Sequence, residues 1–284
     1  MKIIWPNFFI VGAPRAGHTS LYNYLDGVQE IYMSPVKAPG YFLSKDFEGK
    51  YNKEKYLALF EDVKDEKAIG EASSYMTDSE SPKLIHEQIP NAKIIMILRD
   101  PIQRAYSHHL QALRGGYENL TFEKAFHNYL KTDDKSSEFY KHIIGPGLYY
   151  EPVKKFQEIF GPERVKIVIF EEYVQDTKKT VKDILEFLGV EAELPENVNE
   201  AYNAYSEPLG KFGTLIVKNK FINKFAKKIL IKSKRQEILR IVTNKKGKKP
   251  KISDEDRILL KQIYKNDDEK LKELLGYELP WSTV

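Results

Sequence analysis

The chain has 284 residues, of which 42% are hydrophobic and 30% are charged, and its formal net charge is +4. This length suits a single α/β domain with a substantial core, so no second domain is required. The sequence contains no cysteine, which excludes disulfides, zinc–thiolate sites and a thiol nucleophile.

The N-terminal residues enter an apolar strand directly, without the basic stretch and apolar core of a secretory signal. Nowhere do about twenty apolar residues run uninterrupted, as a membrane-spanning helix requires. We therefore expect a cytoplasmic protein without a membrane span.

The segment 8–25, FFIVGAPRAGHTSLYNYL, predicts a strand, a glycine-bounded loop and a helix. Gly12 and Gly17 keep the frame of the nucleotide-binding pattern G-x-x-x-x-G-K-[ST], but His18 stands where the lysine belongs. The simpler alternative is a tight strand-to-helix turn without a ligand. The apolar strand before the loop and the amphipathic helix after it favour a phosphate-binding loop.

This loop is suited to one phosphate or sulfate group. Backbone N–H groups after Gly17 point towards a ligand at a helix N-terminus, and the hydroxyls of Thr19 and Ser20 add further donors. Arg15 contributes a forked cation. A β,γ-phosphate pair with magnesium has weaker support without the lysine, which disfavours a P-loop kinase.

Alternating strands and helices follow this segment and predict a parallel sheet with helices on both faces. Residues 32–55 read as irregular. The expected strands are 68–72, 93–98 and 165–173, and the expected helices are 56–63, 81–89, one from Pro101 onwards, 122–130, 149–160 and 178–189.

A second anion-seeking group follows the strand 93–98. Arg99 ends that strand, and the next helix carries Arg104, Ser107, His108 and His109. Ligands of open parallel sheets bind beyond the carboxyl ends of the strands, so Arg99 is expected to face the same ligand as Arg15. The alternative is an Arg99–Asp100 surface ion pair with Ser107 as an ordinary helix residue.

Residues 211–251 are rich in lysine and arginine and contain Glu237 as their only acid. Interleaved apolar residues predict amphipathic helices within the same domain. The segment reads as a solvated helical subregion, a lid over a bound ligand, a docking face for an acidic acceptor, or a membrane-surface contact. A nucleic-acid partner is not favoured, because no reading motif accompanies the charge.

Together these segments resemble the PAPS-dependent sulfotransferases, where PAPS is 3′-phosphoadenosine 5′-phosphosulfate. The segment 14–20 is similar to the family pattern P-[KR]-x-G-T-[TS], and 99–107 matches R-[DN]-P-x-x-R-A-x-S. Weaker similarities extend the resemblance over nearly the whole chain: GEASSYM at 70–76, G-x-Y at 147–149, KKGKKP at 245–250 and the closing ELPW at 278–281.

The resemblance implies a P-loop-like sulfotransferase fold, with PAPS as donor, PAP as product and no metal. The 5′-phosphosulfate would be bound by Arg15, Ala16, Gly17, His18, Thr19 and Ser20. Arg99 and Ser107 would bind the 3′-phosphate, and Tyr149, Lys246, Gly247 and Lys248 would complete the nucleotide site. Arg15 is our choice to neutralise the leaving group, and Lys37 would lie near the sulfuryl group.

The sequence departs from the family at the expected general base. Related sequences commonly read S-P-x-K-E-P-H-[FY]-F, whereas this chain reads SPVKAPGYF, with Ala38 in place of the glutamate and Gly40 in place of the histidine. A positioned base typically contributes ~10²- to 10⁴-fold to a rate. Three explanations stay open: an altered sequence, a base from elsewhere, or an acceptor that needs little help.

His18 is the first candidate for a substitute base, because an imidazole titrates near neutral pH. We interpret it first as a phosphate ligand and second as a proton acceptor. Glu71 is another acceptor-side carboxylate, whereas His108 and His109 are expected to pack or to face water. Tyr41, Tyr75 and Tyr117 are candidate acceptor-lining residues.

The sequence therefore predicts a sulfotransferase that acts on a hydroxyl or amine of a sugar, lipid or small metabolite. The alternative is a protein that binds PAPS or PAP without efficient turnover, as Ala38 suggests.

Overall fold

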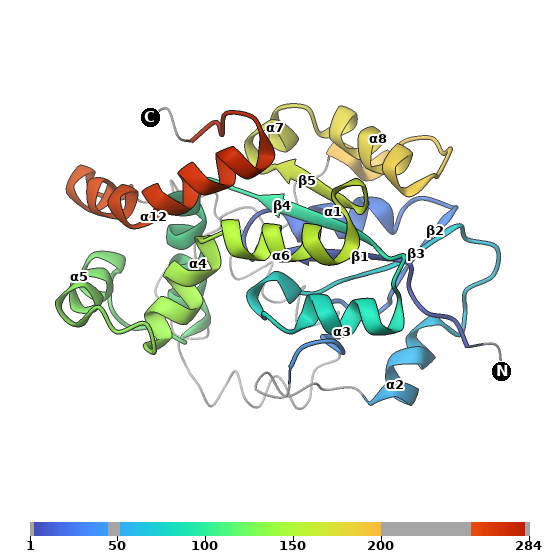
Figure 1. The fold of residues 1–284 in the computed structure, drawn as a ribbon, viewed down its shortest axis with the longest axis horizontal. Coiled ribbons are helices and arrows are strands. Elements are labelled where there is room, and N and C mark those ends of the chain that lie inside the picture. The colour runs from blue at the N-terminus through green and yellow to red at the C-terminus, as the bar shows by residue number, and fades with distance from the viewer. Residues whose placement is uncertain (1–2, 45–51, 200–250, 282–284) are drawn as a thin grey trace, which may run out of the picture.

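The computed structural model describes residues 3–44, 52–199 and 251–281 (Figure 1). Its centre is a parallel sheet in the order β2–β3–β1–β4–β5. The strands are β1 (Phe8–Gly12), β2 (Ile31–Met33), β3 (Ala68–Ala72), β4 (Lys93–Leu98) and β5 (Val165–Ile169). The predicted α/β fold with a central parallel sheet is confirmed.

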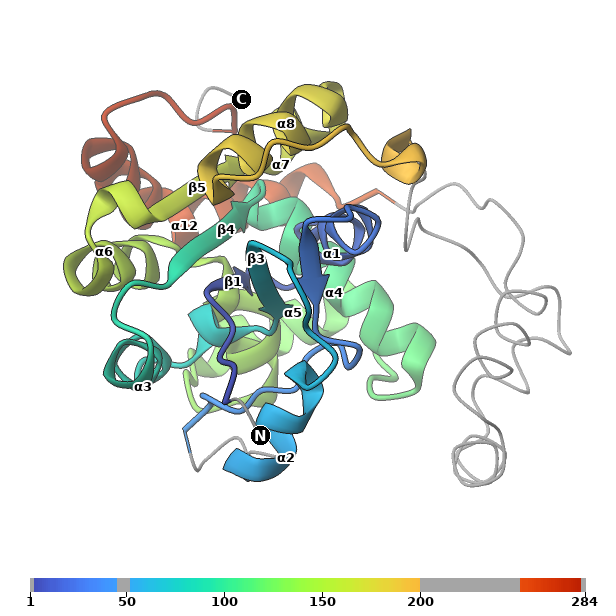
Figure 2. The ribbon, with the colours of Figure 1, turned by 90° about the vertical axis from the view of Figure 1, so that its right-hand side faces the viewer.

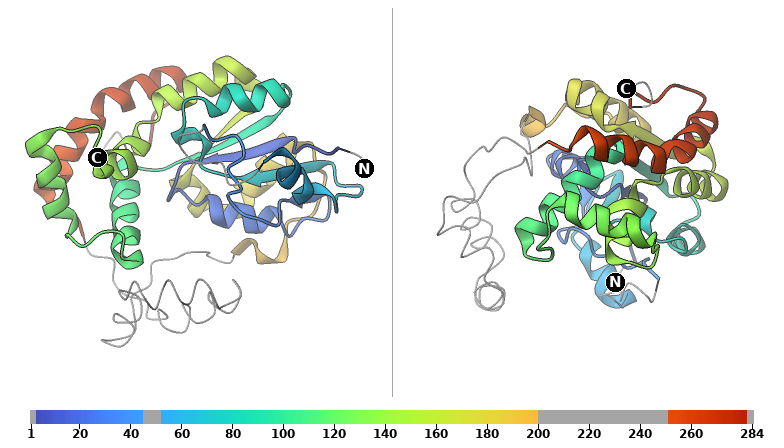
Figure 3. Two further views of the ribbon diagram at one scale, coloured as in Figure 1. Left: turned by 90° about the horizontal axis from the view of Figure 1, so that it is seen from below. Right: turned by 90° about the vertical axis from the view of Figure 1, so that its left-hand side faces the viewer.

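The central strands are apolar along their length because helices cover both faces of the sheet. Every residue of β1 is buried, and in β4 only Lys93 keeps partial exposure. Helices α1 (His18–Leu25) and α8 (Thr177–Leu188) lie on one face, and α3 (Ser81–Gln88) and α6 (Tyr150–Phe160) lie on the other (Figures 2 and 3).

Beyond the carboxyl edge of the sheet, helices α4 (Pro101–Gly115), α5 (Phe122–Thr132) and α12 (Asp254–Leu275) build a second apolar cluster. Its buried members are Ile102, Ala105, Tyr106, Phe122, Phe126, Tyr129, Ile143, Ile144, Ile252, Leu260 and Tyr264. Helix α12 also packs along α6, so it links this cluster to the sheet layer.

Two predicted elements have different limits in the structure. The strand expected over 165–173 ends at Ile169, because Phe170–Gln175 forms helix α7 and turns Glu171 towards the backbone N–H of Asp100. The region expected to be irregular, 32–55, contains most of β2 and the start of helix α2 (Lys53–Leu57), which is capped by Asn52.

The helix expected over 56–63 is therefore α2 followed by a 3-10 turn. The short helical turns are Ala58–Phe60, Tyr75–Thr77, Gly145–Gly147, Pro162–Arg164 and Glu196–Asn199, with a π-helical turn at Tyr140–Ile144. Helix α12 has no counterpart among the predicted elements. The expected basic helices of 211–251 lie outside the described residues, apart from Lys251.

Candidate functional site

The order of the strands places two loops at a topological switch point. The chain leaves β1 towards β2 and β3 on one side, whereas β4 and β5 lie on the other side. The loops after β1 and β4 therefore diverge from neighbouring strand ends, which is where ligands of open α/β sheets bind. These loops carry Arg15 and Arg99.

The loop after β1 has the backbone of an anion-binding turn. Gly17 caps α1 with φ 92°, and a Cβ atom there would lie 3.1 Å from the Phe170 ring and 3.3 Å from the Tyr173 ring, so glycine is required. Helix α1 has no side-chain cap and no acid in its first turn. Its N-terminal amide groups thus favour a negatively charged ligand. Ala16, in the same loop, is fully buried.

The two anion-seeking segments are in direct contact. The Arg15 Nε atom donates to the Ser107 Oγ atom over 3.4 Å, across 92 positions of sequence. The Arg99 Nη1 atom donates to the carbonyl oxygen of Arg15 over 2.9 Å. Helix α4 thus turns Ser107 back towards the loop after β1, as a shared ligand requires.

Positive charge is concentrated around Arg15. Burial, followed by the charges of Arg114, Arg99 and Arg104, lowers the pKa of the Arg15 guanidinium to about 10. Arg15 is still charged at neutral pH, so the cluster is a site where a bound anion relieves repulsion. Sequence reasoning missed Arg114, although it lies seven residues after Ser107 and therefore on the same face of α4.

Arg104 has a structural role within this cluster. Its side chain is fully buried, donates to the carbonyl oxygen of Ile143 and lies 3.4 Å from the Nδ1 atom of His108. Burial, then the charges of Arg104 and Arg15, lowers the pKa of His108 to about 3. His109 is buried, and its Nε2 atom lies 3.1 Å from the Leu120 carbonyl oxygen, which confirms that it packs.

Arg99 is held in place by an aromatic ring against its guanidinium and by a hydrogen bond to its backbone carbonyl oxygen. Its guanidinium carbon lies 4.4 Å from the centre of the Phe170 ring. The fully buried Tyr149 donates its hydroxyl to the Arg99 carbonyl oxygen over 2.9 Å. In this structure Tyr149 therefore holds the backbone of Arg99 through this hydrogen bond. Asp100 caps α4 by accepting from the backbone N–H groups of Ile102 and Gln103.

His18 opens helix α1 beside two cations. The residue keeps partial exposure, but its Nδ1 atom is buried without a hydrogen-bond partner. Burial, then the charge of Lys37, lowers the pKa of His18 to about 3, against the effect of a hydrogen bond to the Ala13 backbone; Arg15 lowers it further. The free imidazole is therefore neutral at neutral pH. Lys37 Nζ donates to Thr19 Oγ1.

The segment Lys37–Ala38 lies at the carboxyl end of β3, next to β1. The backbone N–H of Ala38 donates to the Ala72 carbonyl oxygen over 3.0 Å, and Ala38 has φ 56°. The side chain at this position is a methyl group, which cannot take up a proton. The structure thus places the substituted position beside Lys37 and the loop after β1.

Glu71 is not exposed for contact with an acceptor. Its carboxylate is fully buried and accepts from Tyr56, Ser73 and Tyr75. Burial raises the pKa of Glu71 to about 7 although these hydroxyl donors lower it. The expectation of an acceptor-side carboxylate at Glu71 is therefore wrong.

The three candidate tyrosines have different surroundings. Tyr75 is fully buried, so the expectation that it lines an acceptor is wrong. Tyr41 stacks on Tyr56 with ring centres 4.4 Å apart and packs against Trp5. Tyr117 is 79% exposed at the end of α4. Tyr41 and Tyr117 remain predictions.

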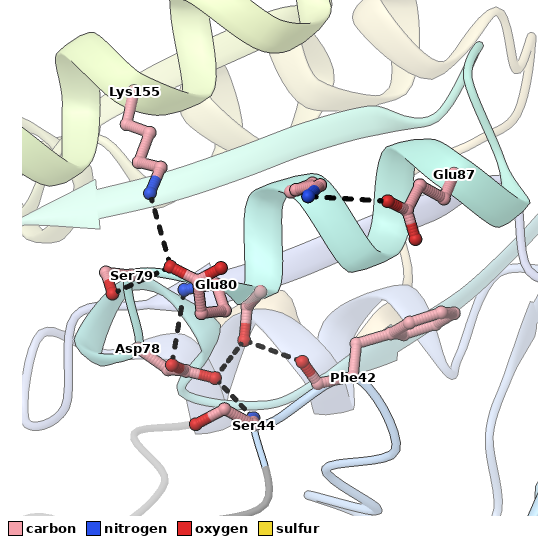
Figure 4. A network of polar contacts seen from close by, with 9 residues as sticks. Phe42, Ser44, Asp78, Ser79, Glu80, Glu87 and Lys155 are labelled. Atoms are coloured by element: carbon pink, nitrogen blue, oxygen red, sulfur yellow. Dashed lines mark hydrogen bonds and ion pairs between the residues drawn. The ribbon is translucent and has the colours of Figure 1, made fainter.

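A polar network fixes the end of the segment 37–44, as Figure 4 shows. Asp78 Oδ2 accepts from the backbone N–H of Ser44 over 2.6 Å and from the Ser81 hydroxyl over 2.9 Å. Ser81 is fully buried, and its Oγ atom also lies 2.8 Å from the Phe42 carbonyl oxygen, so its one hydrogen is shared between the two acceptors. On the outer side of this network, Lys155 and Glu80 approach to 3.8 Å.

Three predicted nucleotide-binding residues, Lys246, Gly247 and Lys248, lie outside the described residues. Among the residues that are described, no cluster of histidine, aspartate and glutamate is arranged to hold a metal ion. In the same part of the chain, every helix is too short or too polar to cross a bilayer.

Comparison with known proteins gives consistent results. A family model described as "Sulfotransferase domain" matches residues 6–273. Human carbohydrate sulfotransferase 15 is 25% identical over 245 residues, covering 65% of this chain and 44% of the human protein. The chain therefore spans less than half of that relative.

Solved sulfotransferase structures share the fold. A sulfotransferase from Alicyclobacillus acidocaldarius has a TM-score of 0.75 and 24% identity, with 99% of this chain and 100% of that chain covered. Mouse sulfotransferase SULT7A1 complexed with PAP has a TM-score of 0.54 and 14% identity, with 95% and 88% covered.

Proposed function

Because the chain belongs to the sulfotransferase family, we propose that it transfers the sulfuryl group of PAPS to a hydroxyl or amine acceptor and releases PAP. The observation that carries this proposal is the contact of Arg15 with Ser107, 3.4 Å apart, at the switch point of the sheet. It brings the two segments that are expected to bind anions into contact, and PAPS is a ligand with two separate anionic ends.

The donor would occupy the site in one orientation. The N-terminus of α1, Arg15 and Thr19 would hold the 5′-phosphosulfate, and Arg99 with Ser107 would hold the 3′-phosphate. In the reaction the bond between sulfur and the bridging phosphate oxygen breaks, and a bond from the acceptor oxygen or nitrogen to sulfur forms. Arg15 would stabilise the charge that develops on the phosphate, as a fixed cation does in phosphoryl transfer.

The acceptor must also lose a proton. Ala38 supplies no base, and His18 in its free form has a pKa of about 3, which makes it a weak one. We therefore favour an acceptor that gives up its proton easily, such as a neutral amine or a phenol of low pKa. The name of the human relative, a carbohydrate sulfotransferase, favours a carbohydrate that carries such a group.

The second candidate is a protein that binds PAPS or PAP without turnover, which the alanine at position 38 favours. Calorimetry comes first: we expect PAP to bind and ATP with magnesium to bind weakly. PAP release from PAPS across amine, phenol and sugar acceptors then separates the two candidates. Preference for ATP with magnesium would reject both candidate functions. PAP binding without turnover on any of these acceptors would support the protein that binds PAPS or PAP without turnover.

A further inference from the structure

We propose that Glu71 is a positioning residue for sulfuryl transfer, which holds the segment 38–42 against the reaction site through Ser73 and Tyr75. The inference rests on the proposed function, because this segment begins beside Lys37 and the loop after β1. No part of it requires Glu71 to touch the donor or the acceptor.

The carboxylate of Glu71 lies at the end of β3 under a set of hydroxyl groups. Glu71 is 0% exposed. Its Oε2 atom accepts from Ser73 Oγ over 2.6 Å, and its Oε1 atom accepts from the hydroxyls of Tyr75 and, over 3.2 Å, Tyr56. An ionised carboxylate only accepts, so each of these hydroxyl hydrogens is directed at Glu71.

Two of the three hydroxyls continue to the backbone of the segment 38–42. Ser73 Oγ accepts from the backbone N–H of Gly40 over 3.1 Å, and the Tyr75 hydroxyl accepts from the N–H of Phe42 over 3.4 Å. Because each hydroxyl donates its one hydrogen to Glu71, only its lone pairs are left to accept from these N–H groups. The carboxylate thereby sets the direction of both bonds without touching the segment.

The segment needs such support because its backbone is unusual. Ala38 has φ 56° and Gly40 has φ 68°, and the left-handed conformation is unfavourable for a residue other than glycine, such as Ala38. A Cβ atom at Gly40 would lie 2.9 Å from the Leu43 side chain. Bonds at Gly40 and Phe42 over-determine this conformation and thereby fix where Lys37 and Ala38 stand.

The third hydroxyl provides a matched control. Tyr56 donates to the same carboxylate, but no described hydrogen bond leads from its hydroxyl to the segment. Tyr56→Phe therefore removes one donor from Glu71 and leaves the two connections to the backbone. Tyr75→Phe and Ser73→Ala each remove one donor and one connection.

The test measures hydrogen–deuterium exchange of the segment 38–44, PAP affinity, and turnover at saturating PAPS, at pH 8 where Glu71 is ionised. We expect Ser73→Ala and Tyr75→Phe to exchange about tenfold faster and to lose about tenfold in kcat, with PAP affinity within about twofold. Glu71→Gln should behave like them, and Tyr56→Phe like the parent.

Equal exchange in Tyr56→Phe and Tyr75→Phe would overturn the proposal. So would parallel losses of kcat and PAP affinity, which indicate a general loss of structure. A chain that binds no PAP and turns over no PAPS would reject the proposed function instead, while the exchange comparison would still test whether Glu71 holds the segment.

Discussion

His18 shows how a single residue adapts the phosphate-binding loop. The free imidazole ring is neutral, and its buried Nδ1 atom has no hydrogen-bond partner. A lone pair repels a phosphate oxygen, whereas an imidazolium N–H donates to it. Binding of a 5′-phosphate group should therefore bring a proton to His18.

We expect PAP binding to take up a proton at pH values between the free and the bound pKa of His18. The anion raises the pKa of His18 above the free value of about 3. Between the free and the bound pKa, affinity falls about tenfold for each unit of rising pH, and above the bound pKa it is constant. Calorimetry in buffers of different ionisation enthalpy measures the uptake.

His18→Thr is the control, because threonine occupies this position in the family pattern and cannot take up the proton. The difference between the two proteins also removes the titration of the phosphates themselves. Adenosine 3′-phosphate, which lacks the 5′ group, should show no difference between them. Equal proton uptake by the parent and His18→Thr would rule out this role.

Arg99 is expected to act at the other end of the donor. Arg99→Ala should weaken PAP binding by about 2 to 3 kcal/mol, roughly 30- to 150-fold, the value of charge-assisted hydrogen bonds. Adenosine 5′-phosphate lacks the 3′-phosphate and should lose little. Titration of both ligands checks this, and equal losses for the two ligands would contradict the assigned pocket.

Ala38 can be tested by restoring the carboxylate. The loop already holds a non-glycine residue at φ 56°, so Ala38→Glu adds no new backbone strain. We expect kcat to rise ~10²- to 10⁴-fold with an unactivated hydroxyl acceptor, and less with an amine or phenol that needs little help. Ala38→Gln has the same size without the basicity, and an equal gain in both variants would exclude general-base catalysis.

At the scale of elements, helix α12 supports the site from outside the sheet. Asp267 on α12 accepts from the backbone N–H of Tyr149 over 2.6 Å and from that of Tyr150 over 3.2 Å. It therefore caps α6 with a negative charge at the helix N-terminus, where charge is favourable. The Tyr149 hydroxyl in turn donates to the carbonyl oxygen of Arg99, so Asp267 helps to position Arg99 through Tyr149.

Asp267→Ala should lower the free energy of unfolding by about 1 to 2 kcal/mol, the cost of a lost helix cap. It should also weaken PAP binding several-fold, because Arg99 loses its support. Glu269→Ala on the same helix removes only an exposed partner of Lys265 and should change stability by less than about 0.5 kcal/mol. Urea unfolding measures the stability of both variants. Identical unfolding midpoints for Asp267→Ala and Glu269→Ala would disprove the cap.

The elements that sequence predicts well are those whose burial is continuous. Strands β1 and β4 are apolar on both faces, so their pattern has one interpretation. Strand β2 has three residues, too few to show the alternation of apolar and polar residues by which a strand is recognised. Helix α12 buries Leu260, Tyr264 and Leu271 in a mostly charged sequence, so its apolar stripe is narrow.

The residues of the candidate site differ in the same way in how far the sequence predicts them. Arg15 and Arg99 are found from sequence because Arg15 lies in the loop after the buried strand β1 and Arg99 directly follows the buried strand β4, and parallel strands end at one edge. The contributions of Arg114, Phe170 and Asp267 depend on how helices α4, α7 and α12 pack against those loops. Local patterns do not specify that packing, which is decided by contacts between residues far apart in the chain.

At the scale of the molecule, the proposed donor site lies between two apolar clusters. The loop after β1 belongs to the sheet layer, whereas Ser107 lies on α4, whose apolar face packs into the second cluster. A ligand that contacts both sides adds a connection between the layers. Its binding free energy is then a term in the stability of the whole fold.

We expect PAP at one hundred times its dissociation constant to stabilise the folded chain by about 2.7 kcal/mol and to raise Tm by roughly 5 °C in one cooperative transition. Because the ligand connects both layers, hydrogen exchange should slow in β1 and in α4 together. Adenosine 5′-phosphate at the same saturation gives the same free energy by mass action but should slow exchange in β1 only. Protection of α4 by both ligands to the same degree would mean that the 3′-phosphate does not reach the second cluster.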